Sequence, residues 1–290
     1  MTEPASRFYL SQGLKLHYAD WGNESASPLL LIHGERDTCR TWDFVAEQLR
    51  DAYHVLAIDL RGHGDSQWPL GALYTEIAFI HDVAQFVSLL GAAPLSILGH
   101  SLGGSIGLLY SGTFPENVRK VVAIEGLGPT PEKASQREAV PIEARLRESI
   151  ALRGQSSSRA RRTYPDIDAA VARMREVNGR LGKEKARHLS VHGTYQNEDG
   201  TFSWKFDPAL RARTRLGDLS YEQQYRLWDR ISCPVLLVRG TESWASDPLV
   251  DGRAGRFRAV RSVNIVGAGH WVHHDQLDPL LRELRGFFGE

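Results

Sequence analysis

The sequence predicts an α/β fold: a mostly parallel central sheet with helices on both faces, interrupted by a long helical insertion. Up to about residue 128, short apolar runs alternate with stretches of helical periodicity. A polar, helix-forming stretch then continues to about residue 229 without an apolar strand run. After it, the alternation of strands and helices returns and continues to the last predicted helix.

The predicted strands are mostly short and apolar throughout, which is typical of strands that are covered on both faces. The first two form a hairpin, because Gln12-Gly13 separates two short segments rich in aromatic and aliphatic residues. By residue number, the predicted strands are 8–10, 14–18, 29–32, 54–58, 95–98, 121–124, 234–238 and 263–266.

Apolar side chains at helical spacing predict the helices. Residues 76–90 carry such a stripe and are followed by Gly91, a residue type that commonly ends helices. Another helix begins directly after Ser101. Further helices are predicted over 167–177, after a capping box at Ser220 and over 277–287.

This pattern divides the chain into a core in two pieces and a cap. Residues 1–128 and 232–290 are expected to form the core, and residues 129–231 a helical cap inserted between them. The length of 290 residues fits this division. A single hydrophobic core rarely grows beyond about 250–300 residues.

Composition narrows the expected partners. Lys and Arg together number 35, as do Asp and Glu, and no basic stripe stands out, so neither nucleic acid nor a membrane is expected. Cys39 and Cys233 lie far apart and form no zinc-type cluster, so we expect reduced core thiols and no metal. The N-terminus lacks a signal-peptide pattern and no apolar run approaches the ~18 residues of a membrane span. The sequence therefore predicts a cytoplasmic protein that acts on a small-molecule substrate.

The sharpest motif is Gly99-His100-Ser101-Leu102-Gly103, a G-x-S-x-G between a predicted strand and a predicted helix. A nucleophilic serine needs a tight strand-to-helix turn that exposes its hydroxyl, and the flanking glycines permit that turn. The helix that follows offers backbone N–H groups and a positive dipole end to a developing oxyanion. Ser101 is therefore the predicted nucleophile.

A serine hydroxyl needs a base and an acid that orients the base. His270 follows Gly267-Ala268-Gly269, between the last predicted strand and the last helix, and is the predicted base. Glu125 and Glu242 are both candidates for the acid. Each follows a core strand and lies between Ser101 and His270 in the sequence, so chain order does not separate them.

Two further turns lie at strand ends. His33-Gly34-Glu35 follows a predicted strand, and a backbone N–H there, that of Glu35, could complete an oxyanion hole with that of Leu102. Residues 59–66 contain a G-x-G, but no third glycine follows at Gln67. That segment is therefore interpreted as a structural turn and not as a dinucleotide site.

With these pieces in this order, the chain resembles the α/β-hydrolase superfamily along nearly its whole core. The matching motifs are His33-Gly34, Asp59 through Gly64 to Ser66, Gly99 to Gly103, and Gly267 to His270. The spacing of His33-Gly34, Asp37, Arg40, Trp42 and the segment 123–127 is similar to bacterial relatives of the serine-hydrolase-like proteins. This resemblance implies the α/β-hydrolase fold with an inserted cap.

The resemblance also bears on the acid. Most family members place an Asp after the strand that corresponds to 234–238, but here that position is Ser243, and Glu242 is displaced by one. Haloalkane dehalogenases use a Glu after the preceding core strand, in a segment similar to Ile124-Glu125. Their nucleophile is Asp, so their chemistry does not carry over. On this basis Glu125 is favoured over Glu242.

Other signals suggest how the substrate is bound. Trp42, Trp204, Trp228 and Trp271 either line an apolar pocket or pack in the core. The run of Arg159, Arg161 and Arg162 in the predicted cap is interpreted as a solvated face, with an anionic substrate as the alternative.

The sequence therefore predicts a serine hydrolase that cleaves a carboxylic ester of a small, mostly apolar substrate, without a cofactor or metal. Its predicted site comprises Ser101, His270 and Glu125, with the backbone N–H groups of Glu35 and Leu102. The alternatives are a carbon–carbon bond hydrolase with the same triad and a slow ligand sensor.

Overall fold

A computed structural model describes residues 2–71, 74–158, 161–212 and 218–289. Within them, eight strands form one sheet in the order β1-β2-β4-β3-β5-β6-β9-β10. β1 pairs antiparallel with β2 and β2 antiparallel with β4, and all other neighbours are parallel. This sheet confirms the predicted fold class. The strands are β1 Ala5–Ser11, β2 Leu14–Asp20, β3 Ser27–Ile32, β4 Tyr53–Ile58, β5 Leu95–His100, β6 Val118–Ile124, β9 Val235–Gly240 and β10 Val260–Ile265.

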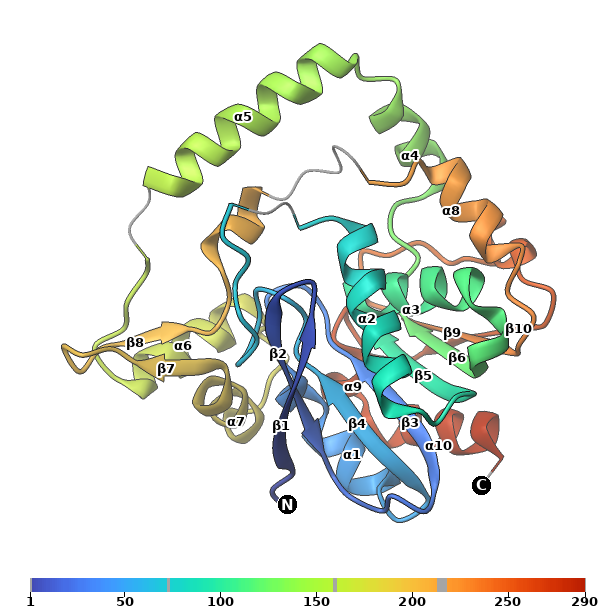
Figure 1. The fold of residues 1–290 in the computed structure, drawn as a ribbon, viewed down its shortest axis with the longest axis horizontal. Coiled ribbons are helices and arrows are strands. Elements are labelled where there is room, and N and C mark those ends of the chain that lie inside the picture. The colour runs from blue at the N-terminus through green and yellow to red at the C-terminus, as the bar shows by residue number, and fades with distance from the viewer. Residues whose placement is uncertain (1, 72–73, 159–160, 213–217, 290) are drawn as a thin grey trace.

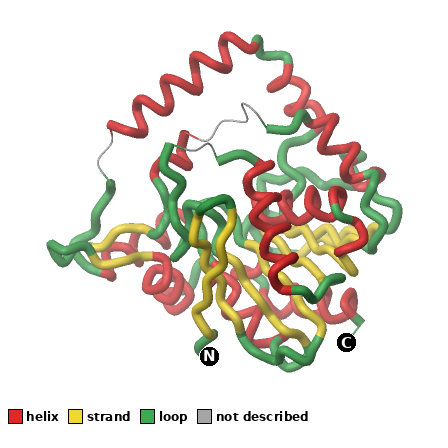
Figure 2. The backbone as a smooth tube through the Cα atoms, viewed as in Figure 1, coloured by secondary structure: helices red, strands yellow, loops and turns green. Residues whose placement is uncertain are grey.

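Helices cover both faces of this sheet (Figures 1 and 2). Successive residues of a strand point to opposite faces, so a strand buried on both sides must be apolar at every position. In β3, Leu30 packs into the cluster with α2, α3 and α8, whereas Leu31 packs into the cluster with α1, α9 and α10. These helices are α1 Asp43–Leu49, α2 Glu76–Leu90, α3 Leu102–Thr113, α8 Tyr221–Trp228, α9 Val272–Asp275 and α10 Leu277–Phe288.

Several predicted elements match closely. The predicted hairpin forms, with Gln12 and Gly13 at φ +49° and +76°, as its tight turn requires. Helix α2 ends as expected at Gly91, which adopts the left-handed conformation at φ +64°. Helix α1 was not predicted, because its single apolar face spans too few residues to show a clear period.

Between β6 and β9 the chain forms the inserted segment, residues 129–231, which is mostly helical. Figure 1 shows its longest helix, α5, lying across the top of the molecule, away from the sheet. The segment also holds a two-stranded ribbon, β7 with β8. Besides α8, its elements are α4 Pro131–Glu138, α5 Ile142–Ser158, α6 Ile167–Val177, α7 Lys183–Gly193, β7 Thr194–Gln196 and β8 Phe202–Trp204.

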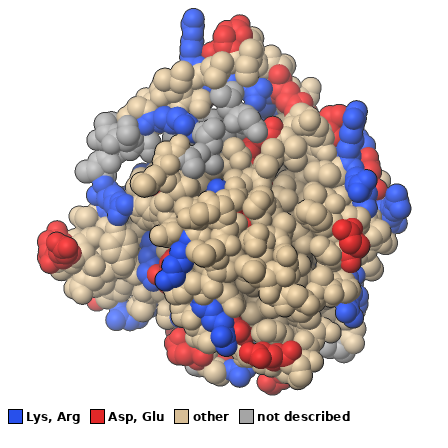
Figure 3. Space-filling model, in the orientation of Figure 1, with Lys and Arg blue, Asp and Glu red and all other residues tan. Residues whose placement is uncertain are grey.

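The surface carries both signs of charge. Figure 3 shows Lys and Arg interspersed with Asp and Glu over one face, in keeping with the equal numbers of the two in the sequence. Both cysteines are buried and free, as expected. Among the described helices, none combines the length and the apolar character needed to cross a membrane.

Candidate active site

Ser101 lies on a sharp turn between β5 and α3. Its backbone has φ +51° and ψ −116°, a conformation that a non-glycine residue adopts only when its surroundings enforce it. The N–H of Ser101 donates to the carbonyl oxygen of Ile124 at 2.8 Å, which ties the turn to strand β6. The strain therefore places this side chain at the carboxyl edge of the sheet, at the N-terminus of a twelve-residue helix.

Glycines around the turn allow the close packing that holds it. A Cβ at Gly99 would lie 2.4 Å from the carbonyl oxygen of Gly103, and one at Gly103 would lie 2.1 Å from that of Ile32. A Cβ at Gly126 would approach the Cα of Gly104 to 2.6 Å. Any side chain at these positions would push the helix away from the strands, so the G-x-S-x-G spacing is a packing requirement of this turn.

His270 and Glu125 come together at the same edge. His270 Nδ1 lies 3.1 Å from Oε2 of Glu125, whose side chain is fully buried, whereas that of His270 is 23% exposed. Glu125 directly follows β6 with φ +53°, a second strained non-glycine residue beside Ser101. This arrangement can orient the imidazole and can stabilise its protonated form.

Other donors fix the Glu125 carboxylate. Its Oε1 accepts a hydrogen bond from the backbone N–H of Gly240 at 2.8 Å, and its Oε2 accepts one from the hydroxyl of Ser243 at 2.5 Å. Glu242, the other candidate acid, is half-exposed and pairs with Arg180 instead. The structure thus brings Glu125, and not Glu242, to His270.

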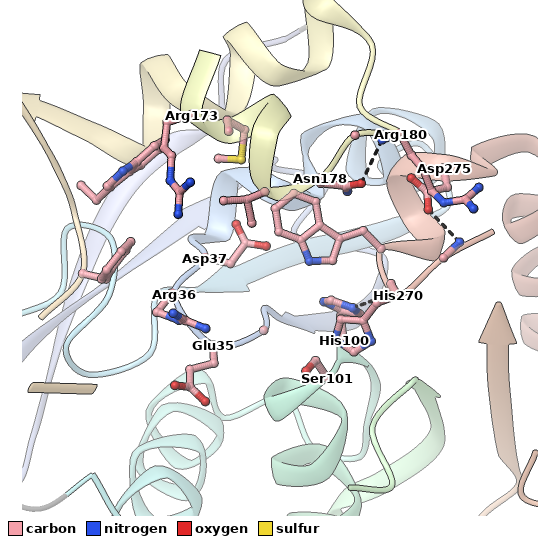
Figure 4. A pocket seen from close by; sticks show the side chains of 18 of the residues that line it. Glu35, Arg36, Asp37, His100, Ser101, Arg173, Asn178, Arg180, His270 and Asp275 are labelled. Atoms are coloured by element: carbon pink, nitrogen blue, oxygen red, sulfur yellow. Dashed lines mark hydrogen bonds between the residues drawn. The ribbon is translucent and has the colours of Figure 1, made fainter. Parts of the chain in front are cut away.

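Ser101 and His270 line one pocket of about 940 Å³ (Figure 4). Among the residues that the structure describes, no hydrogen bond joins the two side chains, and such contacts commonly tighten only when substrate binds. The loop that carries His270 is held by Asp275, whose Oδ2 accepts a hydrogen bond from the N–H of Gly269 at 2.8 Å. This role of Asp275 was not predicted from the sequence. The glycine-rich loop before His270 was the signal that could have indicated it.

The loop after β3 forms another wall of the pocket. Gly34, Glu35, Arg36 and Asp37 all line it, and the side chains of Glu35 and Arg36 are exposed. His33 holds the loop from below, because its Nε2 accepts a hydrogen bond from the N–H of Leu60 at 3.0 Å. The expected oxyanion loop therefore lies beside Ser101.

The inserted segment provides the opposite wall. Its aromatic contributors are Tyr164, Trp204 and Phe206, and Trp244 and Trp271 of the sheet domain join them. Of the four tryptophans considered from the sequence, Trp204 and Trp271 line the pocket, whereas Trp42 and Trp228 are fully buried in the core.

Arginines also face the pocket. They are Arg36, Arg162, Arg173, Arg180 and Arg211. Of the arginine run considered from the sequence, Arg162 lines the pocket, whereas Arg161 stacks on the ring of Trp68, 4.1 Å from its centroid. Arg159 lies outside the described residues.

Three buried histidines lie behind the pocket. The ring centroid of His100 lies 4.8 Å from that of His270 and 4.6 Å from that of His273, and those of His273 and His274 lie 4.1 Å apart. Burial lowers the pKa of His100, His273 and His274 well below the usual value, because a charged ring would be poorly solvated there. These three rings are therefore neutral near pH 7.

The fold and this site define the class of a hydrolase with a serine on a strand-to-helix turn. The sequence matches the α/β hydrolase family over residues 29–283, and the chain belongs to that family. An esterase of Mycobacterium tuberculosis is 30% identical, over 92% of this chain and 84% of its own length. A serine hydrolase-like protein of Dictyostelium discoideum is 24% identical, over 97% of this chain and 80% of its own length.

Solved structures agree on the fold. The thioesterase domain from the curacin biosynthetic pathway superposes with a TM-score of 0.85 at 22% identity, covering 98% of this chain and 99% of that domain. Together with the named relatives, this makes the chain a hydrolase with the α/β-hydrolase fold.

Proposed function

We propose that this hydrolase cleaves a carboxylic ester through an acyl-enzyme at Ser101. The observation that carries the proposal is the hydrogen bond between His270 and the buried carboxylate of Glu125, in the same pocket as the strained Ser101. A relative with the curated name esterase, 30% identical over most of the chain, supports the same chemistry.

In the first step, Ser101 Oγ attacks the ester carbonyl while His270 Nε2 accepts the hydroxyl proton. Glu125 accepts the hydrogen bond from His270 Nδ1–H and stabilises the imidazolium that forms. When the tetrahedral intermediate collapses, the bond to the alcohol oxygen breaks, and His270 returns the proton to that oxygen. The alcohol leaves and the acyl group remains on Ser101.

In the second step, His270 takes a proton from water, and the hydroxide attacks the acyl carbon. The backbone N–H groups of Glu35 and Leu102 hold the negative oxygen in both steps. One such donor is commonly worth about 3 kcal/mol of transition-state stabilisation. As this intermediate collapses, the bond between the acyl carbon and Ser101 Oγ breaks and His270 returns the proton to Oγ, which releases the carboxylic acid and restores Ser101.

We propose that the inserted segment is a cap that selects the substrate. Tyr164, Trp204 and Phe206 offer an apolar surface for the body of the substrate. Arg36 and Arg162 form no ion pair with any described residue, although Arg162 lies 5.5 Å from the ring of Tyr164. A substrate with an apolar body and one negative charge would use both features.

The test is hydrolysis of a p-nitrophenyl ester series, from acetate to decanoate and with the hemisuccinate added, by the wild type and Ser101→Ala. We expect turnover with a chain-length optimum in the wild type and none in the variant, which should stay folded. Full activity in Ser101→Ala would refute the nucleophile assignment. Labelling of Ser101 by a reactive phosphonate without turnover of any ester would refute ester hydrolysis and would favour the sensor.

A further inference from the structure

Behind the wall of the pocket, three potential metal ligands converge. The ligand atoms of Asp37, His100 and His273 all lie within 4.8 Å of one another. Asp37 comes from the loop after β3, His100 ends β5, and His273 belongs to α9. Asp37 and His100 also line the pocket, where Figure 4 shows both, so a small ion has a route to them.

Each of these side chains has one buried polar atom without a partner: Asp37 Oδ2, His100 Nδ1 and His273 Nδ1. Buried polar atoms are nearly always hydrogen-bonded, so an unpartnered one on each of three neighbouring side chains indicates a missing ligand. His100 is 1% exposed and His273 is fully buried. A Cβ on Gly34 would lie only 3.0 Å from His100 Nδ1, so glycine keeps the approach to that nitrogen open.

The protonation of His100 follows from its other nitrogen. Nε2 lies 2.8 Å from the carbonyl oxygen of His270, which can only accept, so Nε2 carries the hydrogen. In the neutral ring Nδ1 is then the bare nitrogen, the form in which imidazole binds metals.

Two other groups of ligand-type side chains differ from this one. In the group of His17, Cys39 and Asp59, the carboxylate already accepts hydrogen bonds from the His17 ring and from the N–H of Cys39. In the second group, both oxygens of Asp43 accept hydrogen bonds from Arg40. The carboxylates of those two groups already accept hydrogen bonds, whereas Asp37 Oδ2 accepts none.

We propose that Asp37, His100 and His273 form a binding site for a divalent transition-metal ion such as Zn²⁺, and that the bound ion inhibits the enzyme. Two imidazoles and one carboxylate suit Zn²⁺, Co²⁺ or Ni²⁺ better than Mg²⁺, which prefers oxygen ligands. Donors on one tetrahedral zinc lie roughly 3.4 Å apart. The ligand atoms lie within 4.8 Å of one another, so a bound ion would draw them closer together.

Inhibition follows from where the ligands are attached. Asp37 belongs to the loop proposed to supply an oxyanion N–H, and His100 directly precedes Ser101. His273 lies three residues after His270, whose carbonyl oxygen accepts the hydrogen bond from His100. An ion that draws these ligands together displaces the oxyanion loop relative to the nucleophile and the base. Misplacement by about 1 Å can lower a catalytic rate about a hundredfold.

The first test is binding, which does not depend on hydrolysis. Metal-free Ser101→Ala protein is titrated with Zn²⁺ by calorimetry and with Co²⁺ by visible absorption, and Mg²⁺ serves as the hard-cation control. We expect one Zn²⁺ or Co²⁺ per chain and no Mg²⁺. Absence of binding at millimolar Zn²⁺ would overturn the proposal, whatever the esterase assay shows.

Variants then locate the ion. His273→Phe removes both ring nitrogens but keeps a ring to stack on Trp42, and Asp37→Asn removes the charge at constant size. Each should weaken Zn²⁺ binding at least tenfold. His192→Phe, in the group with Asp43, is the matched control and should leave binding unchanged. If His273→Phe does not fold, as judged by circular dichroism, Asp37→Asn decides alone.

The last experiment connects Zn²⁺ binding to the rate of ester hydrolysis. In wild-type protein, Zn²⁺ should inhibit ester hydrolysis with the affinity measured by calorimetry, and EDTA should restore the rate. In Asp37→Asn, the inhibition constant, taken relative to that variant's own uninhibited rate, should rise at least tenfold. Unchanged inhibition in that variant, or loss of binding in His192→Phe, would place the ion elsewhere and overturn the assignment.

Discussion

The sheet core and the inserted segment are packed very differently. Most strand residues of the core are buried, in two large apolar clusters on opposite faces of the sheet. The inserted segment has a cluster of its own with only four buried members, Val171, Leu181, Ala186 and Leu189. Its longest helix, α5, exposes apolar side chains at Ile142, Leu146 and Ile150. The core, with α8 of the inserted segment packed into it, is therefore the rigid part, and the rest of the inserted segment has far less to hold it in place.

The two regions that differ in packing also contribute different kinds of residues to the pocket. Ser101, Glu125 and His270 all stand at strand ends of the core, where small displacements are resisted. The inserted segment contributes only lining side chains, such as Trp204 and Met174. We therefore expect changes in the core to alter kcat and stability, and changes in the inserted segment to alter substrate selection and KM.

The largest effect should come from the carboxylate that contacts His270. Glu125→Gln keeps the size of the side chain but cannot stabilise the imidazolium, so kcat should fall about 10³–10⁴-fold. Glu242→Gln only breaks an exposed pair with Arg180 and should change kcat less than about threefold. Steady-state kinetics on the best ester measure both. A loss confined to Glu242→Gln would assign the acid to Glu242 and reverse the interpretation.

A smaller effect should separate the two regions by stability. Leu98 is fully buried in the core and Leu189 is buried in the small cluster of the inserted segment. Leu98→Ala should lower the free energy of unfolding by about 4–5 kcal/mol, and Leu189→Ala by about 2 kcal/mol, because a sparsely packed site collapses more easily. Urea unfolding measures both values.

The effects of the two substitutions on KM should rank in the opposite order to their effects on stability. Leu189→Ala should raise KM, since the cap becomes less ordered, whereas Leu98→Ala should leave KM unchanged in the fraction that is folded. Equal losses of stability from the two substitutions, with no change in KM for either, would show that the inserted segment folds as one unit with the core.

The same contrast explains what could be predicted from the sequence. Apolar strand runs, helical periodicity and the G-x-S-x-G are local patterns, so the sheet, most of its helices and the position of Ser101 followed from them. The two candidate acids share chain order and strand-end position, and the contacts of Glu125 with His270, Gly240 and Ser243 distinguish them. Those contacts join residues more than a hundred positions apart.

Metal ligands drawn from three distant segments leave no spacing motif either, which is why Asp37, His100 and His273 could not be grouped from the sequence. In the inserted segment, apolar spacing predicted α6 and the capping box predicted α8, whereas the more polar α4, α5 and α7 were not individually predicted. Residues that line the pocket from it, such as Arg173 and Trp204, could be placed only in three dimensions.

The smallest predicted effect tests whether the two walls of the pocket cooperate on a charged substrate. Figure 4 shows Arg36 of the loop after β3 and Arg173 of α6 approaching the pocket from opposite sides. Arg173 is already paired with Glu176 at 2.6 Å, whereas Arg36 has no ion pair among the described residues. Arg36 is thus the better candidate to bind an anionic group.

Arg36→Gln should lower kcat/KM for the p-nitrophenyl hemisuccinate about tenfold, close to 1.4 kcal/mol, and leave the neutral butyrate ester unchanged. Arg36→Lys should recover part of the loss, since it restores the charge without the planar fork. Arg175→Gln, exposed on α6 and not part of the pocket lining, is the control. The preference for the anionic ester should weaken with added salt, because Arg36 is exposed. Equal losses on both esters in Arg36→Gln would instead assign this residue to the conformation of the oxyanion loop, where its φ of +62° already holds it in a strained position.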